Sequence, residues 1–424
     1  MTATALPSGA PFDLGDRTFW AAPWAERYAA FARLRTEDPL AGFAEPEFPG
    51  FPPGPGFRAV VRHADVEQVS RDPETFCSGQ GAVSIMDLPP EAHEFFGSLI
   101  SMDAPRHTKI RRVAARAFTP KRVGGLLDDV ERIAGEVVAA ATARAREGDG
   151  TFDLVGEVAA PLPLLVICDM MGVPESRRAE VIQHSNVILA GDDPEYITDP
   201  SNALQDYLTA GAGLASLMTE LAEARTASPT DDVTSALVHG EVDGESLTPQ
   251  EIASFFILLC VAGNETTRNA ITHGVWGLHL EPAQRAAWAG DVDGLMGTAV
   301  DEIVRWASPI NWMRRTATRD AVVGDVEVAA GEKLLLVYGS ANRDEAVFAD
   351  PDRLDLRRSL NPHQGFGAHG PHFCLGAHLA RREIEVAFRT LFRELPDLTV
   401  VGEPDRLSSI FVNGIKHLPV AVGG

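Results

Sequence analysis

The stretch that decides the fold lies near the C-terminus and reads Phe366-Gly367-Ala368-His369-Gly370-Pro371-His372-Phe373-Cys374-Leu375-Gly376. It places one cysteine in a glycine-rich loop. The residues that follow, 377–395, carry apolar side chains at close to helical spacing, so the loop is predicted to run directly into a helix. Exposed amide N–H groups and the positive end of a helix dipole favour a thiolate over a thiol at such a position.

A thiolate in this kind of loop is suited to holding a metal-bearing cofactor. Glycines allow a large planar group to approach the backbone, and a cysteine thiolate is one of the protein ligands that bind haem iron. The alternative is a buried free cysteine, which is a common state for a lone cysteine. The loop on its own leaves both interpretations open.

A second informative segment is a long apolar stretch with polar residues at its middle. Thr248-Pro249-Gln250-Glu251 has the N-cap, first-turn proline and reciprocal glutamate of a helix start, and Pro282 ends the run. A helix of about 30 residues, with a rise of about 1.5 Å per residue, would cross a whole domain. Residues 254–262 are almost entirely apolar, as in a buried helix, and Ala262-Gly263-Asn264-Glu265-Thr266-Thr267 follows them.

The polar residues of that helix, Glu265, Thr266 and Thr267, need an explanation, because burying a carboxylate and two hydroxyls costs free energy. One explanation is structural: a threonine in mid-helix can donate its hydroxyl to the carbonyl one turn back and bend the helix. The other is a functional site in which an acid and an alcohol deliver protons inside a dry pocket.

A third segment, Asp301-Glu302-Ile303-Val304-Arg305, places Glu302 and Arg305 on one helix face at i, i+3. Exposed pairs of this kind are nearly neutral in energy, so the pair indicates little by itself.

Together the three segments resemble the cytochrome P-450 family, and the resemblance extends over nearly the whole chain. The loop matches the family's Gly-x-His-x-Cys-x-Gly pattern at Gly370, His372, Cys374 and Gly376. The resemblance implies that Cys374 is the axial thiolate and metal ligand of a haem b iron. The loop is one residue longer than in most members, with Phe366 eight positions before the cysteine, so the usual packing of Phe366 on the proximal haem face is not implied.

The resemblance also implies roles for the other two segments. The long helix matches the family's Ala-Gly-x-Asp/Glu-Thr pattern, in which Thr266 would hold dioxygen at the haem, Glu265 would belong to the proton relay and Gly263 would leave room for the gas. Glu302 and Arg305 would be buried and would brace the Cys loop together with an arginine or histidine shortly before it. Buried haem propionates need cationic donors. Positions that the family uses for them hold His107, Arg111, Arg315 and His372.

Length and composition fit one large domain over residues 1–424, mainly α with small β-sheets. The 424 residues contain no linker-like stretch and no repeat. The four cysteines form no CxxC pair, which indicates a reducing compartment, and neither a signal peptide nor a membrane anchor is recognisable, so we expect a soluble cytoplasmic protein. The patterns predict a strand at 58–61, an amphipathic helix at 126–138, hairpin strands within 321–337 and C-terminal strands within 410–422. Residues 340–351 resemble the meander that precedes the Cys loop in the family.

The charge of the chain bears on its partners. The net charge of −23 disfavours nucleic acid and anionic membranes. Residues 106–122 nevertheless contain seven Lys or Arg and no acid. This segment is either a solvated helix face or a dock for an acidic electron carrier. The resemblance implies a ferredoxin with its ferredoxin reductase, because no flavin or iron–sulfur module is fused to the chain.

Four features narrow the resemblance: Glu94-Phe95-Phe96-Gly97-Ser98, Trp312-Met313-Arg314-Arg315, the long Cys loop and Asn413-Gly414-Ile415-Lys416. Within the family they resemble the actinobacterial subgroup that hydroxylates terminal carbons of methyl-branched lipids, isoprenoids and sterol side chains. It implies a monooxygenase that inserts one atom of O₂ into a C–H bond of an apolar substrate. A terpene or macrolide substrate is an alternative, as is a haem-thiolate protein that binds a ligand or uses peroxide; the acid and alcohol at Glu265 and Thr266 favour the monooxygenase. The matching segments give these candidate substrate contacts, each of which could instead be core: Ile85, Met86, Phe95, Leu99, Ile257, Val261, Ala262, Ile310, Trp312, Ile410 and Phe411.

Overall fold

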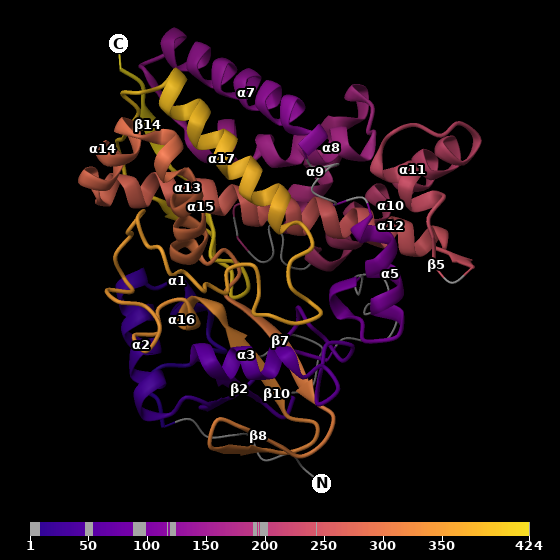
Figure 1. Ribbon diagram of the computed structural model, residues 1–424, viewed down its shortest axis with the longest axis vertical. Coiled ribbons are helices and arrows are strands. Elements are labelled where there is room, and N and C mark those ends of the chain that lie inside the picture. The colour runs from indigo at the N-terminus through magenta and orange to yellow at the C-terminus, as the bar shows by residue number, and fades with distance from the viewer. Residues whose placement is uncertain are drawn as a thin grey trace.

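The computed structural model describes residues 9–423 apart from 47–53, 88–98, 117, 119–123, 190–192, 194, 196–201 and 243. It is mainly helical with small sheets, as the sequence predicts. Figure 1 shows that the helices labelled α7, α8, α13 and α17 gather at one end of the molecule, and that the largest sheet lies at the other end with α2 and α3.

The α-helices are α1 (Arg17–Ala21), α2 (Trp24–Glu37), α3 (His63–Arg71), α5 (Arg106–Ala115), α7 (Leu127–Glu147), α8 (Pro161–Met171), α9 (Glu175–Leu189), α10 (Ala203–Ala227), α11 (Val233–Val238), α12 (Pro249–Leu258), α13 (Asn264–Leu280), α14 (Pro282–Gly290), α15 (Val292–Ala307), α16 (Tyr338–Ala341) and α17 (Ala377–Glu394). A 3₁₀ turn, η1 (Leu99–Ser101), and two π-helical turns, η2 (Val155–Ala159) and η3 (Leu259–Gly263), complete the helical elements.

The strands are β1 (Gly42–Phe43), β2 (Phe57–Val60), β3 (Phe76–Cys77), β4 (Thr151–Asp153), β5 (Glu241–Val242), β6 (Glu245–Ser246), β7 (Trp312–Ala317), β8 (Ala321–Val323), β9 (Val326–Val328), β10 (Lys333–Val337), β11 (Thr399–Val400), β12 (Asp405–Arg406), β13 (Ile415–His417) and β14 (Pro419–Ala421). The largest sheet has the order β1-β2-β10-β7-β3. In it β10 runs parallel to β2 and antiparallel to β7. The predicted hairpin strands within 321–337 are confirmed, and the predicted C-terminal strands occupy only 415–421, with Val412 in an isolated bridge to Ile310.

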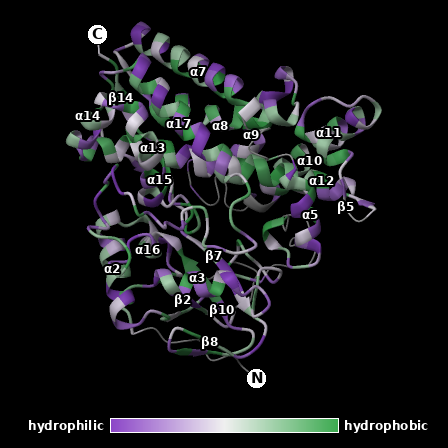
Figure 2. Cartoon of the chain, viewed as in Figure 1, coloured by the Kyte–Doolittle hydropathy of each residue, from purple (hydrophilic) through white to green (hydrophobic). Residues whose placement is uncertain are grey.

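The hydrophobic core follows from the patterns of the elements. All five residues of β10 are buried, so both faces of this strand are covered. α7 buries one stripe, including Val130, Ile133, Val137 and Val138, and Figure 2 shows its turns alternating between hydrophilic and hydrophobic colours. No helix in the described ranges is long and apolar enough to cross a membrane.

The predicted long helix is confirmed, with an interruption at its centre. Thr248 and Glu251 form the predicted capping box at the start of α12, and α13 ends just before Pro282. The two helices are joined by a π-helical turn over Leu259–Gly263. Single π-turns inside α-helices frequently occur at functional sites, because they reorient side chains and free backbone groups.

Candidate functional site

The Cys374 loop is fixed by its own backbone. The Cys374 N–H donates to the carbonyl of Phe366 at 2.9 Å, which closes the loop. Gly367 has a φ of +84°, a left-handed conformation that favours glycine. Gly370 lies so close to α3 that an added Cβ would be 2.2 Å from the Ser70 carbonyl oxygen. The loop then enters α17 with Gly376 at the N-cap, which confirms the predicted helix start.

The electrostatics at Cys374 differ from the expectation. Burial raises the pKa of the Cys374 thiol, and this effect outweighs the Gly376 amide and the positive charges of Arg111 and Arg381, which lower the pKa. Metal binding would favour the thiolate, because a metal takes the deprotonated ligand and releases the proton.

The other three cysteines are less exposed than Cys374. Cys77, Cys168 and Cys260 are buried and free, whereas Cys374 is half-buried. Burial raises the pKa of Cys168 to about 12 and raises that of Cys260 well above its usual value. Cys374 is thus the cysteine that combines partial exposure with two nearby arginines.

Phe366 packs against the hydrophobic core from the start of the loop. The Arg381 guanidinium carbon lies 4.5 Å from the centre of its ring, a cation–π contact, and the His363 ring centre lies 5.7 Å away. Arg381 also pairs with Asp301 at 2.7 Å. Despite the extra residue, the aromatic side chain is held between the loop and α17.

The four candidate propionate donors are brought together from three separate segments. The rings of His107 and His372 lie 4.2 Å apart. Arg111 donates to the carbonyl of Phe373 at 2.5 Å. Burial lowers the pKa of His372 to about 2, and the positive charge of Arg315 adds to this effect.

This cluster fits a buried dianionic group. Burial and the neighbouring Arg111 lower the pKa of His107, and burial lowers that of Arg315. The Nε2 atom of His107 is buried and has no hydrogen-bond partner in the described part of the chain. Arg111 and Arg315 lie beside two histidines, one with an unpaired ring nitrogen, and haem carboxylates would compensate the positive charge of the arginines. The residues present therefore fit haem.

Thr266 makes the contact that the structural explanation anticipates. Its hydroxyl donates to the carbonyl of Ala262 at 2.7 Å, one turn back. Thr266, Val261 and Ala262 are half-buried, whereas Asn264, Glu265 and residues 267–278 are buried. Thr266 therefore lies on the less covered side of the helix.

Glu265 lies in a polar network of its own helix. It forms an ion pair with Arg268 and accepts a hydrogen bond from the Asn269 side chain at 2.7 Å. Its second oxygen, Oε2, is buried without a partner among the described residues. The neighbouring Gly263 leaves room for the side chain of Ile167, because a Cβ added to Gly263 would lie 2.9 Å from Ile167 Cδ1.

Two further polar residues near this site escaped the sequence reasoning. Asn264 is buried, and neither polar atom of its amide has a hydrogen-bond partner within the described ranges. Glu383 of α17 is buried beside Thr267. The sequence could have indicated Glu383, because this glutamate lies on the apolar face of the helix predicted after the Cys loop.

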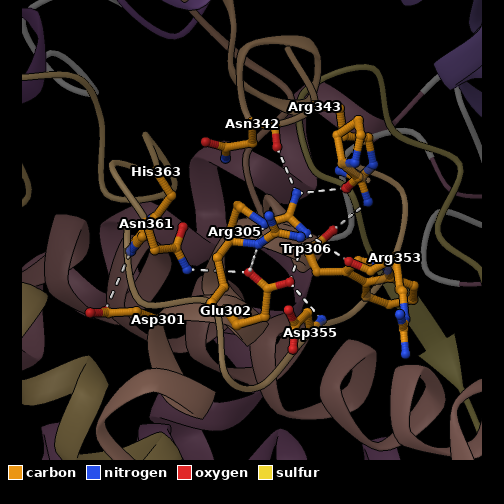
Figure 3. Close-up of polar contacts among 12 residues, drawn as sticks. Asp301, Glu302, Arg305, Trp306, Asn342, Arg343, Arg353, Asp355, Asn361 and His363 are labelled. Atoms are coloured by element: carbon orange, nitrogen blue, oxygen red, sulfur yellow. Dashed lines mark hydrogen bonds and ion pairs between the residues drawn. The ribbon is translucent and has the colours of Figure 1, made fainter. Parts of the chain in front are cut away.

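The Glu302–Arg305 pair is a buried structural centre (Figure 3). Both side chains are fully buried, and the guanidinium binds the carboxylate bidentately at 2.7 and 2.8 Å. Arg358 contacts Glu302 Oε2 at 3.0 Å, which confirms the predicted arginine shortly before the Cys loop. Arg305 also donates to the carbonyls of Asn342, Pro351 and Arg353, so the pair fixes the meander that leads to the loop.

The candidate substrate contacts lie in more than one place. Ile85 and Trp312 belong to one apolar cluster, with Ile410 and Phe411 packed against it. The Trp312 indole donates to the Ile410 carbonyl at 2.9 Å, and its ring lies 5.1 Å from that of Phe411. The remaining candidates are distributed as follows: Leu99, Ile257 and Val261 lie in or against the main core, Ile310 lies against a third cluster, Met86 and Ala262 are half-buried, and Phe95 lies outside the described residues.

Two cations of the basic segment pair with acids of two other elements, β6 and α12. Lys109 pairs with Glu245 of the β5–β6 hairpin, and Arg106 pairs with Glu251 at 3.4 Å. Arg116 donates to the Glu241 carbonyl at 3.2 Å. Arg112 is exposed, and Lys121 and Arg122 lie outside the described residues.

Comparison with known proteins points in one direction. The family model described as Cytochrome P450 matches residues 58–398. The chain is 49% identical over 411 residues to the methyl-branched lipid omega-hydroxylase of Mycobacterium bovis, covering 97% of this chain and 94% of that protein. It is 40% identical over 422 residues to the steroid C26-monooxygenase of Rhodococcus jostii, covering 98% and 85%. Among solved structures it is similar to Mycobacterium marinum cytochrome P450 CYP268A2 in complex with pseudoionone, with a TM-score of 0.89, 40% identity and coverage of 98% and 100%.

Proposed function

Since the chain belongs to the cytochrome P450 family and is a monooxygenase, we propose that it hydroxylates a methyl-branched lipid at a terminal carbon. The observation that carries the proposal is the 49% identity to a methyl-branched lipid omega-hydroxylase over 97% of the chain. A monooxygenase inserts one atom of O₂ into a C–H bond. The proposal adds two points to the monooxygenase activity: the class of substrate and the carbon that is hydroxylated.

We infer that this site would hold haem b, with Cys374 as the residue that would bind its iron and His107, Arg111, Arg315 and His372 as those that would bind its propionates. Bound haem would supply the chemistry of O₂ activation. The chain supplies the fixed loop, cations that neutralise the carboxylates and a partly covered hydroxyl at Thr266 Oγ1. That hydroxyl can hold or pass on a proton if it exchanges its bond to Ala262 for a bond to a ligand.

A terminal C–H bond is stronger than the neighbouring C–H bonds of the chain, so intrinsic reactivity favours internal hydroxylation. Terminal hydroxylation therefore requires that the protein hold the terminal carbon at the reacting site. A channel that admits the end of the chain first would achieve this, and small misplacements of the reacting atoms cost rate steeply. The proposed walls are the apolar cluster of Ile85, Trp312, Ile410 and Phe411, with Ile257 and Val261 of the long helix.

We propose that a ferredoxin with its reductase supplies the electrons and docks on the exposed basic positions of α5 around Arg112. The pairing of Lys109 and Arg106 with acids leaves a smaller basic surface than the sequence alone suggests.

The proposal is tested with the purified haem protein, an iso-branched fatty acid and its straight-chain counterpart of equal carbon number. We expect the branched chain to shift the Soret band by displacing iron-bound water, and mass spectrometry of turnover products to show mainly terminal hydroxylation. Mainly internal hydroxylation, or no spectral response to any branched lipid, would overturn the proposal and favour a terpene or macrolide substrate.

A further inference from the structure

Two buried cations hold a segment that lacks regular structure. Arg314 of β7 is 1% exposed and Lys333 of β10 is 2% exposed. Arg314 pairs with Leu335 across the sheet, two residues from Lys333, so the two cationic side chains leave the same face. Both reach residues 84–87, which form neither helix nor strand.

The Arg314 guanidinium binds the backbone carbonyls of residues 84–86. Its Nη1 atom lies 3.2 Å from the carbonyl oxygen of Ser84, 3.1 Å from that of Ile85 and 3.3 Å from that of Met86. Its Nη2 atom donates to Asp87 Oδ1 at 2.7 Å. Three successive carbonyls are thus tied to one rigid guanidinium, which restricts both sliding and rotation of the segment.

Lys333 completes the arrangement. Its ammonium donates to the Ile85 carbonyl at 3.0 Å and lies 3.0 Å from Asp87 Oδ2. It also binds Glu45 Oε1 at 2.7 Å. Asp87 therefore bridges the two cations, one with each carboxylate oxygen.

The charges of the group balance only if Asp87 is ionised. Two buried cations face two carboxylates, those of Glu45 and Asp87. Burial raises the pKa of Asp87, but hydrogen bonds and charge from Arg314 and Lys333 outweigh it and lower the pKa. Removing the Asp87 charge would leave a buried cation without its partner, which is costly.

The segment that is held in this way bears on the proposed substrate site. Ile85 packs in the cluster that contains Trp312, and Ile410 and Phe411 pack against the same cluster. Trp312 is in the same strand as Arg314. The position of the Ile85 side chain in that wall therefore depends on the carbonyl contacts to Arg314 and Lys333.

We propose that Asp87, Arg314 and Lys333 form an ionic clamp that positions the Ile85 wall, and that Asp87 is a positioning residue for substrate selectivity. The inference rests on the proposed function in placing the substrate against the Ile85 cluster. Asp87 does not touch the reacting atoms; it acts through the backbone of residues 84–87.

The test compares Asp87→Asn with a matched control, Glu345→Gln. Glu345 is also an exposed carboxylate on a buried arginine, Arg35, but it lies away from residues 84–87 in the contact network. For Asp87→Asn we expect faster hydrogen–deuterium exchange in the peptide that covers 78–87, a rise of about 3- to 10-fold in the dissociation constant of the iso-branched fatty acid, and a lower ratio of terminal to internal products. The control should change none of these, and both variants should keep the thiolate-type carbon monoxide spectrum.

The readouts separate the clamp from the proposed function. Unchanged exchange at 78–87 in Asp87→Asn would overturn the clamp whatever the substrate is. Faster exchange with unchanged affinity and product ratio would overturn the positioning role. If the wild type does not bind the branched acid, the proposed function fails, and exchange still decides whether the clamp exists. Should Asp87→Asn not fold, Asp87→Glu, which keeps the charge but lengthens the side chain, provides the same comparisons.

Discussion

The hydroxyl of Thr267 donates a hydrogen bond of 3.3 Å to Glu383 Oε2 and so joins α13 to α17. α13 carries Thr266, and α17 begins directly after the Cys374 loop. Glu383 is buried, and its Oε1 atom has no partner in the described part of the chain. Burial raises the pKa of Glu383 to about 8, although the Thr267 hydroxyl lowers it in part. The folded protein therefore favours the neutral carboxyl at neutral pH.

This contact predicts a pH-dependent stability. The folded state binds the Glu383 proton more tightly than the unfolded state, whose pKa is near 4.5. The free energy of unfolding should therefore fall as pH rises from about 4.5 to about 8. Glu383→Gln removes the titration and should be more stable than the wild type at pH 8 by about 2–5 kcal/mol, with little difference below pH 5. Denaturant unfolding across this pH range checks it; parallel pH profiles for the two proteins would contradict the prediction.

Cys374→Ser should abolish the red-shifted band of the reduced carbon monoxide complex, because that band requires a thiolate ligand. Cys77→Ser serves as the control, since Cys77 is a free cysteine in β3 outside the loop. We expect the control to keep the band. Survival of the band in Cys374→Ser would refute the assignment of the axial ligand.

Thr266→Ala should leave haem and substrate binding nearly unchanged and divert reducing equivalents to peroxide. Thr272 offers a matched control, because its hydroxyl also donates to the carbonyl four residues back, at 2.8 Å, in the same helix. The ratio of product to cofactor consumed should fall in Thr266→Ala only. Equal losses in Thr266→Ala and Thr272→Ala would mean that Thr266 only shapes the helix.

Glu302→Gln should destabilise the protein by about 3–5 kcal/mol, because it leaves Arg305 and Arg358 without a buried anion. Glu37→Gln, which breaks an exposed pair with Arg33, should cost less than about 1 kcal/mol. Thermal unfolding and haem content measure both effects. If the two variants have similar stability, the buried pair does not brace the loop.

Reduction by an acidic ferredoxin should slow as ionic strength rises, since exposed charges are screened beyond ~10 Å at about 0.1 M salt. Arg112→Glu should slow electron transfer without changing substrate affinity, whereas Arg33→Glu on the distant α2 should not. Stopped-flow reduction at several salt concentrations distinguishes them. A rate that does not depend on salt would count against this dock.

The features that the sequence by itself determined are those set by local spacing. The capping box at Thr248 and the glycine loop before α17 follow from residues only a few positions apart, whose geometry the helix period fixes. The i, i+3 spacing likewise placed Glu302 beside Arg305. The family pattern added the arginine before the loop, now identified as Arg358.

The tertiary structure decided what depends on contacts between distant segments. Glu383 meets Thr267 across 116 residues, and Asp87 meets Arg314 across 227. Packing also decided that burial outweighs the Gly376 amide and the charges of Arg111 and Arg381 in setting the direction of the Cys374 pKa, because desolvation depends on everything that surrounds the thiol. Local patterns predict elements and their ends, but the burial of a charge and the identity of its partner arise only when those elements pack together.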